Sequence, residues 1–202
     1  MARLVVVSNR VAVPDANGKI PPGGLAVAVN AAMRNREGMW FGWSGEVNEN
    51  PPPPSHLTAD NVEYVLTDLR PADFQSYYNG YANRSLWPLL HYRTDLAEYH
   101  HRDYQGYRRV NEFIAERLAP LIRPDDIIWV HDYHLLPLAR ALRQLGVDNR
   151  IGFFLHIPLP PPDMLKTLPK HQSVIGTMAD YDLVGFQTEQ DAGNFARYVT
   201  GV

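Results

Sequence analysis

Residues 126–162 place the strongest constraint on what this chain can fold into. In this segment an apolar run ends at His131 and Asp132, a helical pattern follows, and a second apolar run ends at His156. A strand–helix–strand unit of this length suits the crossover that joins two parallel strands. In open parallel sheets, ligands bind beyond the carboxyl ends of the strands, because loops converge there and helix N-termini point inward. The segment therefore predicts a binding cleft beside these residues.

Strand and helix patterns alternate through the rest of the chain as well. Apolar runs of strand type cover residues 4–7, 39–43, 62–66, 127–130, 151–155 and 183–186. Helical patterns cover residues 25–36, 71–83, 104–122, 163–168, 172–178 and 189–198, and the prolines of 51–54 predict an exposed connector. This alternation predicts an α/β fold with a doubly wound, mostly parallel Rossmann-like sheet. A length of 202 residues fits a single domain, 1–202.

The composition excludes several classes of function. Hydrophobic residues make up 45% and charged residues 20% of the chain, and the formal net charge is −3. No broad basic field is available to attract nucleic acid or an acidic membrane surface. The chain has no cysteine, which excludes a disulfide framework and thiolate chemistry. It opens directly on a strand pattern and has no apolar run of transmembrane length, so we expect a cytoplasmic protein.

Polar side chains follow several of the predicted strands. The strand ends carry Ser8, Asn9 and Arg10, then His131 and Asp132, then His156, and finally Gln187 and Thr188. One polar strand end means little, because loops are polar in any case. Several at the same edge of one sheet favour a ligand site, although they do not define a reaction.

Arg10 and the glycine pair Gly23-Gly24 are candidates for binding an anion. A guanidinium can hold a phosphate with two hydrogen bonds, and the alternative for Arg10 is a surface ion pair. Glycines before a helix let the backbone approach a phosphate, and the alternative is a simple turn. No GxGxxG follows the first strand, which argues against a nicotinamide dehydrogenase.

The histidines near the predicted cleft have several interpretations. The spacing of His131, Asp132 and His134 matches no known metal motif, so we expect no metal. Asp132 is expected to cap the helix that opens at Tyr133. His156 precedes a proline-rich loop, which is expected to be stiff and to hold the imidazole or the adjacent carbonyl in one place. The alternative is a histidine that simply ends a strand.

Aromatic residues are a further candidate for ligand binding. Tyr77, Tyr78 and Trp87 lie in SYYNGYANRSLWP, and Trp40 and Trp43 lie in WFGWSGE. Aromatic faces bind the C–H faces of sugars, and a tyrosine hydroxyl can reach phosphate or sugar oxygens. The alternative is that these rings belong to the hydrophobic core.

Together these residues resemble the trehalose-6-phosphate synthases, a family of retaining glycosyltransferases built from two facing Rossmann-type domains. The matching strings are LVVVSNR, GGLAVAV, MWFGWSGE, YYNGYAN, LWPLLHYR, GYRRVNEFIA, DIIWVHDYHLLPLA, RIGFFLHIP and DYDLVGFQTE. They run in order through nearly the whole chain, and HDYHLLPLA followed by the HIP loop is highly specific. The family transfers glucose from a nucleotide sugar, usually UDP-glucose, to glucose 6-phosphate and forms α,α-trehalose 6-phosphate with retention.

The resemblance implies an acceptor site made from residues of this chain. Arg10 and Tyr78 match residues that hold the phosphate of glucose 6-phosphate. Asp132 matches a residue that accepts hydrogen bonds from sugar hydroxyls, and Trp87 matches one that walls the acceptor ring. The domain 1–202 would therefore be the acceptor-binding, N-terminal half of the fold.

The resemblance also implies which residues bind the sugar donor and which take part in catalysis. Gly23 and Gly24 match the loop that approaches the donor diphosphate. His156 matches a residue beside the reacting carbon that stabilises the transition state and selects the anomer, so His156 and Asp132 are the expected catalytic residues. No carboxylate needs to act as a covalent nucleophile, because in the family the acceptor attacks in a front-face displacement. In that displacement the departing phosphate takes the acceptor's proton. No cofactor is implied, and the partners are the small-molecule substrates.

The family's second domain, which carries most of the nucleotide contacts, has no counterpart in these residues. A half-cleft cannot exclude water or hold the donor from both sides. We therefore expect the isolated chain to turn over negligibly, to bind glucose 6-phosphate weakly at best, and to be marginally stable or self-associated.

Two alternatives remain open at this point. One is a paralogous synthase with a different acceptor, since the donor base (UDP, ADP or GDP) is recognised mainly outside these residues. The other is a non-catalytic sugar-phosphate-binding or regulatory subunit that pairs with a complete enzyme.

Overall fold

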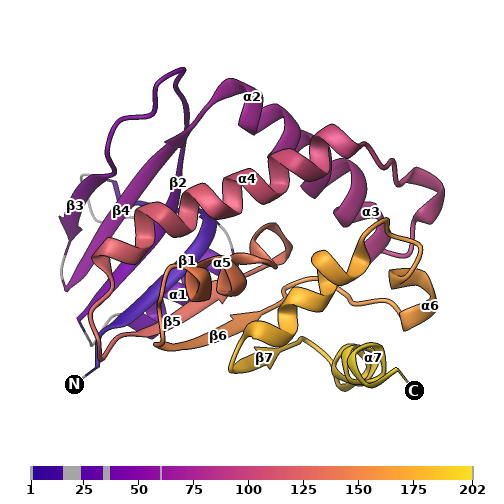
Figure 1. Cartoon of the computed structure of the whole chain (residues 1–202). Coiled ribbons are helices and arrows are strands. Elements are labelled where there is room, and N and C mark those ends of the chain that lie inside the picture. The colour runs from indigo at the N-terminus through magenta and orange to yellow at the C-terminus, as the bar shows by residue number, and fades with distance from the viewer. Residues whose placement is uncertain (1, 16–23, 34–36, 60, 202) are drawn as a thin grey trace.

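A computed structural model describes residues 2–15, 24–33, 37–59 and 61–201 and contains one seven-stranded sheet in the order β3-β4-β2-β1-β5-β6-β7. The strands are β1 Leu4–Arg10, β2 Gly38–Val47, β3 Ser55–Ala59, β4 Val62–Leu69, β5 Ile127–His131, β6 Arg150–Phe154 and β7 Leu183–Gly185. All neighbouring pairs are parallel except β3 with β4 (Figure 1). The predicted doubly wound, mostly parallel α/β fold is confirmed.

Helices pack on the sheet and divide its core into two layers. They are α1 Gly24–Met33, α2 Pro71–Asp73, α3 Trp87–Leu90, α4 His101–Leu118, α5 Leu138–Gln144, α6 Pro162–Leu165 and α7 Glu189–Thr200. Val6 and Trp40 on one face share a buried cluster with Met33 of α1. Val5 and Val7 on the other face belong to a larger cluster beneath α4, which crosses the sheet in Figure 1.

Helix α4 follows the predicted amphipathic pattern closely. Tyr107, Val110, Ile114 and Leu118, which recur at helical spacing, are buried, whereas Phe113 in the same pattern is only partly buried. The helix proper ends at Leu118, and a 3₁₀ turn, Ala119–Leu121, completes the predicted segment. The 3.6-residue period of the apolar side chains was therefore sufficient to identify the packed face.

Several elements differ from the sequence prediction. The helix expected over 71–83 continues to Leu90, because a wider π-helical segment, Phe74–Leu86, joins α2 to α3. Strand β3 was not predicted, since the side chains of Ser55–Ala59 are mostly exposed and show no apolar alternation. The segment expected to be helical at 172–178 forms 3₁₀ turns, His171–Ser173 and Ile175–Asp180. The predicted helix over 25–36 is described only as far as Met33.

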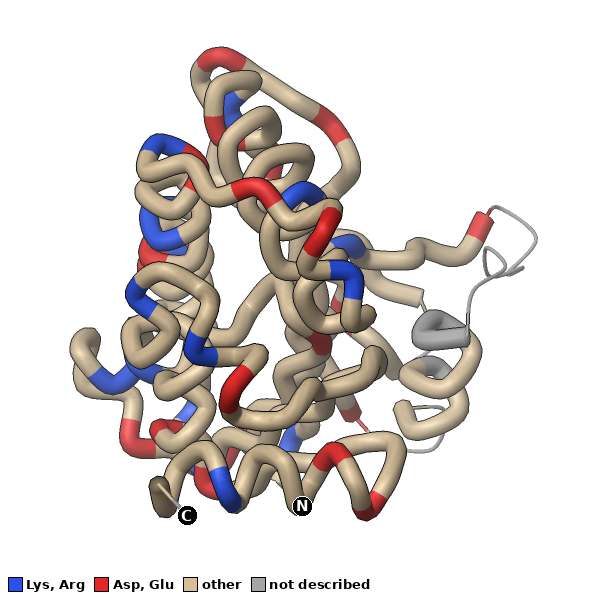
Figure 2. The backbone as a smooth tube through the Cα atoms, turned by 90° about the vertical axis from the view of Figure 1, so that its right-hand side faces the viewer, with Lys and Arg blue, Asp and Glu red and all other residues tan. Residues whose placement is uncertain are grey.

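Figure 2 shows Lys and Arg interspersed with Asp and Glu over the face it presents, without a large field of one sign among the residues drawn. This mixture agrees with the formal net charge of −3. No helix in the described part of the chain combines the length and the apolar character needed to cross a bilayer.

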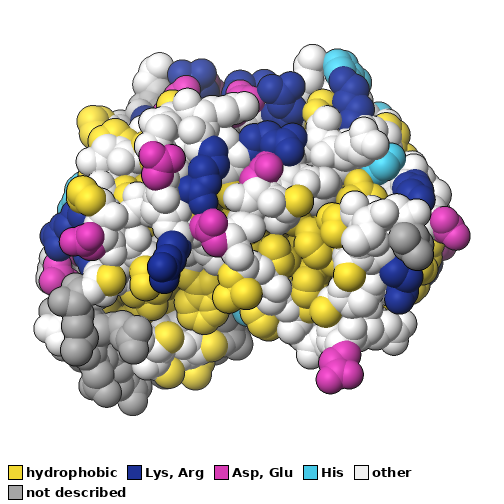
Figure 3. Space-filling view, turned by 60° about the horizontal axis from the view of Figure 1, so that its bottom comes forward, with side chains coloured by type: hydrophobic (Ala, Val, Ile, Leu, Met, Phe, Trp, Pro, Cys, Tyr) yellow, Lys and Arg dark blue, Asp and Glu magenta, His cyan; other side chains and the backbone are white. Residues whose placement is uncertain are grey.

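Part of the sheet face that α1 covers remains open over β5–β7. The side-chain alternation places Ile127, Trp129, Phe154 and Leu183 on this face. Leu183 is 72% exposed and Ile127 is 44% exposed. Figure 3 shows hydrophobic side chains gathered in the middle of the face seen from below. The expected self-association of the isolated chain remains a prediction, and this apolar surface is the feature that motivates it.

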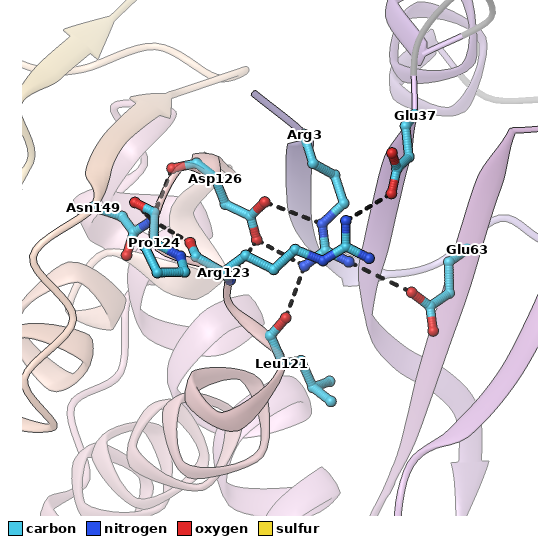
Figure 4. A network of polar contacts seen from close by, with 8 residues as sticks. All are labelled: Arg3, Glu37, Glu63, Leu121, Arg123, Pro124, Asp126 and Asn149. Atoms are coloured by element: carbon cyan, nitrogen blue, oxygen red, sulfur yellow. Dashed lines mark hydrogen bonds and ion pairs between the residues drawn. The ribbon is translucent and has the colours of Figure 1, made fainter. Parts of the chain in front are cut away.

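A buried ion pair joins the amino ends of β1 and β5 (Figure 4). The Nε and Nη2 atoms of Arg3 donate to the two carboxylate oxygens of Asp126, at 3.1 and 2.7 Å. Nη2 also donates to the carbonyl of Leu121 at 2.7 Å, and Nη1 lies 3.6 Å from the Glu63 carboxylate. Arg3 is 6% exposed and Asp126 is 3% exposed. The pair therefore connects β1, β4, β5 and the segment after α4. It lies at the end of the sheet where β1 and β5 begin, opposite the carboxyl ends described below.

We predict that Asp126→Ala lowers the free energy of unfolding by about 3–5 kcal/mol, because it leaves the buried Arg3 guanidinium without its counter-charge. Urea unfolding of the chain measures this loss. Asp125→Ala, at the exposed neighbouring position, is the matched control and should cost less than about 0.5 kcal/mol. The double change Arg3→Met with Asp126→Leu should cost less than Asp126→Ala alone, and an equal or larger cost would contradict this account of the ion pair.

Candidate functional site

The carboxyl ends of three neighbouring strands, β1, β5 and β6, lie at the same end of the sheet. Val7 of β1 pairs with Val130 of β5, and His131 of β5 pairs with Phe154 of β6. The residues that follow these pairs, Arg10, Asp132 and His156, therefore emerge from neighbouring strands. The convergence of strand ends that the sequence predicts is confirmed for these three strands.

Arg10 is a charged side chain with space around it. Its guanidinium carbon lies 5.8 Å from the centroid of the Trp43 ring. Gly45, with φ +94°, borders it, and a Cβ built on Gly45 would come within 2.4 Å of Nη2. Among the described residues, Arg10 makes no side-chain hydrogen bond or ion pair. Within the described part of the chain the Arg10 guanidinium thus has only the Trp43 ring contact, and its role as a ligand for an anion stays a prediction.

Asp132 sits at the junction of β5 with a 3₁₀ turn, Tyr133–Leu135, and has an unusual backbone. Its φ of 74° and ψ of 165° lie in a region that is almost restricted to glycine. Its Oδ1 accepts hydrogen bonds from the backbone N–H of Tyr133 at 3.0 Å and of His156 at 3.3 Å. The predicted cap at Tyr133 is thus confirmed, and the same carboxylate also ties the end of β5 to the end of β6.

The His156 side chain is held by a second histidine. Its Nε2 lies 2.9 Å from Nδ1 of His131, which is 1% exposed. Its backbone carbonyl accepts a hydrogen bond from the Gln187 side chain. Gln187 was noted only as a polar strand end, and it proves to connect the end of β7 to this loop. The prediction that His156 is held in one place is supported by these contacts.

The site residues influence one another electrostatically. Burial raises the pKa of the Asp132 carboxyl, and this rise is opposed by its backbone hydrogen bonds and by the nearby His156. Burial lowers the pKa of His156, and the Asp132 charge opposes that change. Each group therefore partly offsets the desolvation of the other, as expected for an acid and a base in contact.

Tyr78 belongs to a wall of stacked rings beside these strand ends. Its ring centroid lies 5.6 Å from Trp43, 5.5 Å from Phe74 and 5.7 Å from His134. The series Arg10–Trp43–Tyr78 thus connects the cation to the half-buried tyrosine through ring contacts. Arg10 and Tyr78 therefore contact the same ring, Trp43.

The candidate aromatic residues Tyr77, Trp87, Trp40 and Trp43 divide between core and surface, and Trp43 is buried. Tyr77 and Trp40 are fully buried, and the Tyr77 hydroxyl donates to Asn9 Oδ1 at 2.7 Å. Trp87 is 43% exposed, and its ring stacks on His91 at a centroid distance of 4.1 Å. The charge of His91 in turn acts on Asp132. Trp87 is therefore a surface ring near the site, whereas Tyr77 and Trp40 belong to the core.

The glycine pair is only partly visible. Gly24 is the first residue of α1, whereas Gly23 lies outside the described residues. The described residues contain no group of three or more His, Cys, Asp or Glu side chains arranged to hold a metal ion. Sequence reasoning missed Gly45 and His91 as neighbours of the site, and only the strings that contain them drew attention to these segments.

His134 is a buried imidazole outside the hydrogen-bond network. Both of its ring nitrogens are buried without a partner among the described residues, and its ring packs between Tyr78 and Tyr133. Burial lowers the pKa of His134 to about 3, and burial together with His156 lowers the pKa of His131 to about 3. Neither imidazole is charged near neutral pH.

We predict that these two histidines make the chain sensitive to acid. Both take up protons in the unfolded state with a pKa near 6.5 but resist protonation when folded, so stability falls as the pH drops from about 6.5 towards 3. Each should cost about 2 kcal/mol at about pH 5 relative to neutral pH. Urea unfolding at several pH values measures the slope. His134→Gln should flatten it, whereas His101→Gln, on the exposed side of α4, should leave it as in the unmodified chain; an unchanged slope in His134→Gln would contradict this assignment.

Comparisons with known proteins identify relatives of this chain in sequence and in structure. A trehalose-6-phosphate synthase of Sinorhizobium fredii (strain NBRC 101917 / NGR234) is 56% identical over 199 residues, which are 97% of this chain and 43% of that protein. The crystal structure of a UDP-forming α,α-trehalose-phosphate synthase from Burkholderia vietnamiensis matches with a TM-score of 0.94 and 50% identity, over 100% of this chain and 43% of that one. This chain thus spans about two fifths of the length of these relatives.

A third comparison involves a protein with a ligand bound. The α,α-trehalose-phosphate synthase (UDP-forming) from Burkholderia xenovorans, in complex with glucose-6-phosphate, matches with a TM-score of 0.91 and 44% identity, over 99% of this chain and 43% of that one. The sequence profile of glycosyltransferase family 20 matches residues 3–202. The α/β sheet, the grouped strand ends and this match over almost the whole chain lead to one conclusion: the chain belongs to glycosyltransferase family 20.

Proposed function

We propose that this chain is the acceptor-binding half of an enzyme that transfers glucose from a nucleotide sugar to glucose 6-phosphate and forms α,α-trehalose 6-phosphate with retention. The observation that carries the proposal is the grouping of Arg10, Asp132 and His156 at neighbouring strand ends, with the Arg10 charge free of any partner among the described residues. The solved relative that binds glucose 6-phosphate supports the choice of acceptor.

Arg10 and Tyr78 are the proposed phosphate ligands. A guanidinium donates two parallel hydrogen bonds to phosphate, and a tyrosine hydroxyl adds a third. Both side chains contact Trp43, whose ring centroid lies 5.8 Å from the Arg10 guanidinium carbon and 5.6 Å from the Tyr78 ring. A phosphate placed there would neutralise a cation that has no counter-charge among the described residues.

Asp132 and Trp87 are the proposed contacts of the acceptor sugar. The Asp132 carboxylate already accepts two backbone N–H groups and has lone pairs left for sugar hydroxyls. Trp87, which is 43% exposed, offers an aromatic face to the C–H groups of the ring. His91 stacks on the Trp87 ring and also influences the pKa of the Asp132 carboxyl, which places Trp87 near Asp132.

His156 is the proposed group beside the reacting carbon. Its backbone and its ring are both held, so it can stabilise charge that develops in the transition state without reorganising. No side chain described here acts as a covalent nucleophile, and the departing phosphate of the donor takes the acceptor's proton. Catalysis then depends on positioning and electrostatic stabilisation.

UDP-glucose is the proposed donor, in line with the UDP-forming activity named for the solved relatives. Gly24, the first residue of α1, would serve its diphosphate together with the preceding Gly23, because free N–H groups at a helix start favour phosphate. A second domain would supply the remaining donor contacts. We further propose a cytoplasmic location, since nucleotide sugars and sugar phosphates are charged and do not cross membranes unaided.

The first test is binding of glucose 6-phosphate to the chain, measured by NMR titration or calorimetry. We expect millimolar affinity, and we expect Arg10→Ala to weaken it about 10- to 100-fold, the value of a charge-assisted phosphate contact. Arg102→Ala, which removes an exposed arginine on α4, is the matched control and should bind as the unmodified chain does. Glucose without the phosphate should bind more weakly than glucose 6-phosphate. Equal binding of both sugars, or robust trehalose 6-phosphate formation by residues 1–202 alone, would contradict the proposal.

Asp132 allows its backbone role to be separated from its ligand role. Asp132→Ala and Asp132→Gly both remove the carboxylate and should both reduce glucose 6-phosphate binding strongly. Glycine adopts φ 74° and ψ 165° without strain, so Asp132→Gly should be more stable to urea than Asp132→Ala by about 1 kcal/mol or more. If the alanine variant is the more stable one, the backbone strain described for this position is wrong.

A further inference from the structure

We propose that His131 is a positioning residue for His156 and determines which ring nitrogen of His156 faces the substrate. The inference rests on the proposed function, in which His156 stands beside the reacting carbon. It adds a second histidine that touches no substrate and acts only through the first.

The two histidine rings are in hydrogen-bond contact, and each also packs against an aromatic side chain. Nδ1 of His131 lies 2.9 Å from Nε2 of His156. The His131 ring packs on Trp129 with a centroid distance of 4.3 Å, and the His156 ring packs on Phe154 at 4.8 Å. His131 is the last residue of β5 and is 1% exposed. It therefore offers a rigid partner to a side chain on a loop.

The hydrogen bond engages one particular nitrogen of His156. Because Nε2 is bound to His131, Nδ1 is the nitrogen that remains. Nδ1 of His156 makes no hydrogen bond to any described residue, and the His156 side chain is only partly buried. We infer that this is the nitrogen left for a ligand at these strand ends.

The other nitrogen of His131 decides the direction of the hydrogen bond. Nε2 of His131 is buried and has no partner among the described residues. If His156 donated, a neutral His131 would carry its hydrogen on Nε2 and bury an N–H group with no acceptor among the described residues, which leaves a donor unsatisfied at the full cost of its desolvation. If His131 donates from Nδ1, its Nε2 is a bare nitrogen against apolar surroundings. The second arrangement is favoured, and it places hydrogen on Nδ1 of both histidines.

The charges around the pair are consistent with two neutral rings. Burial, together with His156, lowers the pKa of His131 to about 3, and burial also lowers the pKa of His156. The one charged group acting on His156 among the described residues is Asp132, which shifts the His156 pKa in the opposite direction. Two neutral imidazoles can share only one hydrogen in their contact, so the pair has a defined donor and a defined acceptor.

This arrangement has a chemical consequence. A His156 ring with hydrogen on Nδ1 is a donor towards the cleft and cannot accept a proton there. It can bind a hydroxyl or phosphate oxygen and stabilise negative charge on it, but it cannot act as the base that takes the acceptor's proton. By keeping hydrogen on Nδ1 of His156, His131 prevents that nitrogen from acting as the base. A group other than His156 must then accept the proton.

The test is the position of the ring hydrogens in the chain labelled with ¹⁵N at histidine. Long-range ¹H–¹⁵N correlation spectra near neutral pH distinguish a ring nitrogen that carries hydrogen from one that does not. The chain has eight histidines, and spectra of His131→Asn and His156→Gln assign the two of interest. We expect hydrogen on Nδ1 and none on Nε2 in both His131 and His156.

Two substitutions at position 131 separate positioning from packing. His131→Phe keeps a flat ring against Trp129 but removes the donor, so the His156 hydrogen should move to Nε2, the form that an unconstrained imidazole prefers. His131→Asn keeps an N–H donor at the corresponding place and should preserve hydrogen on Nδ1 of His156. His101→Phe on α4 is the control and should leave the His156 signals unchanged. If His131→Phe does not fold, the spectra of the unmodified chain and of His131→Asn still decide.

The inference is overturned if His156 of the unmodified chain carries its hydrogen on Nε2, or if His131→Phe leaves it on Nδ1. These outcomes are separate from the test of the proposed function. Intact glucose 6-phosphate binding with the hydrogen on Nε2 of His156 would contradict only the role of His131. Hydrogen on Nδ1 with no glucose 6-phosphate binding would contradict only the proposed function.

Discussion

The parallel pairing of β1 with β5 and of β5 with β6 is the constraint on which the candidate site depends. This register brings the ends of the three strands to one edge, so residues far apart in the sequence, Arg10, Asp132 and His156, emerge side by side. The buried Arg3–Asp126 pair holds β1 and β5 at the opposite edge. A shift of either strand by one residue would turn its side chains to the other face and separate the site residues.

Asp132 shows how the site concentrates strain where a contact requires it. Its backbone occupies a region that costs about 1–3 kcal/mol for a residue with a Cβ. In this conformation the Asp132 carboxylate accepts hydrogen bonds from the backbone N–H groups of both Tyr133 and His156, and so joins two strand ends. A glycine would remove the strain and also the connection. The strain is therefore tied to the presence of a carboxylate at this point.

The strands that position the site were easier to predict from the sequence than the contacts between the site's side chains. Apolar runs located all the parallel strands, and the polar residues after β1, β5 and β6 correctly marked one edge, because parallel strands end together. Strand β3 escaped prediction, since its exposed residues carry no period-two pattern. The His131–His156 hydrogen bond and the space that Gly45 leaves for Arg10 depend on side-chain directions and on a positive φ, which composition and spacing do not encode.

The electrostatic character of the site limits the chemistry it can perform. Its positive charge is Arg10, its negative charge is Asp132, and its buried imidazoles are neutral, because burial holds the pKa values of His131 and His134 near 3. Asp132 already accepts two backbone hydrogen bonds, which lower the affinity of a carboxylate for protons, although burial acts in the opposite direction. Neutral imidazoles and a hydrogen-bonded carboxylate suit a site that holds and orients a polar ligand rather than one that removes a proton from it. In the reaction proposed above the departing phosphate accepts the proton, so these residues would need to supply only fixed donors, the Arg10 cation and an acceptor for sugar hydroxyls.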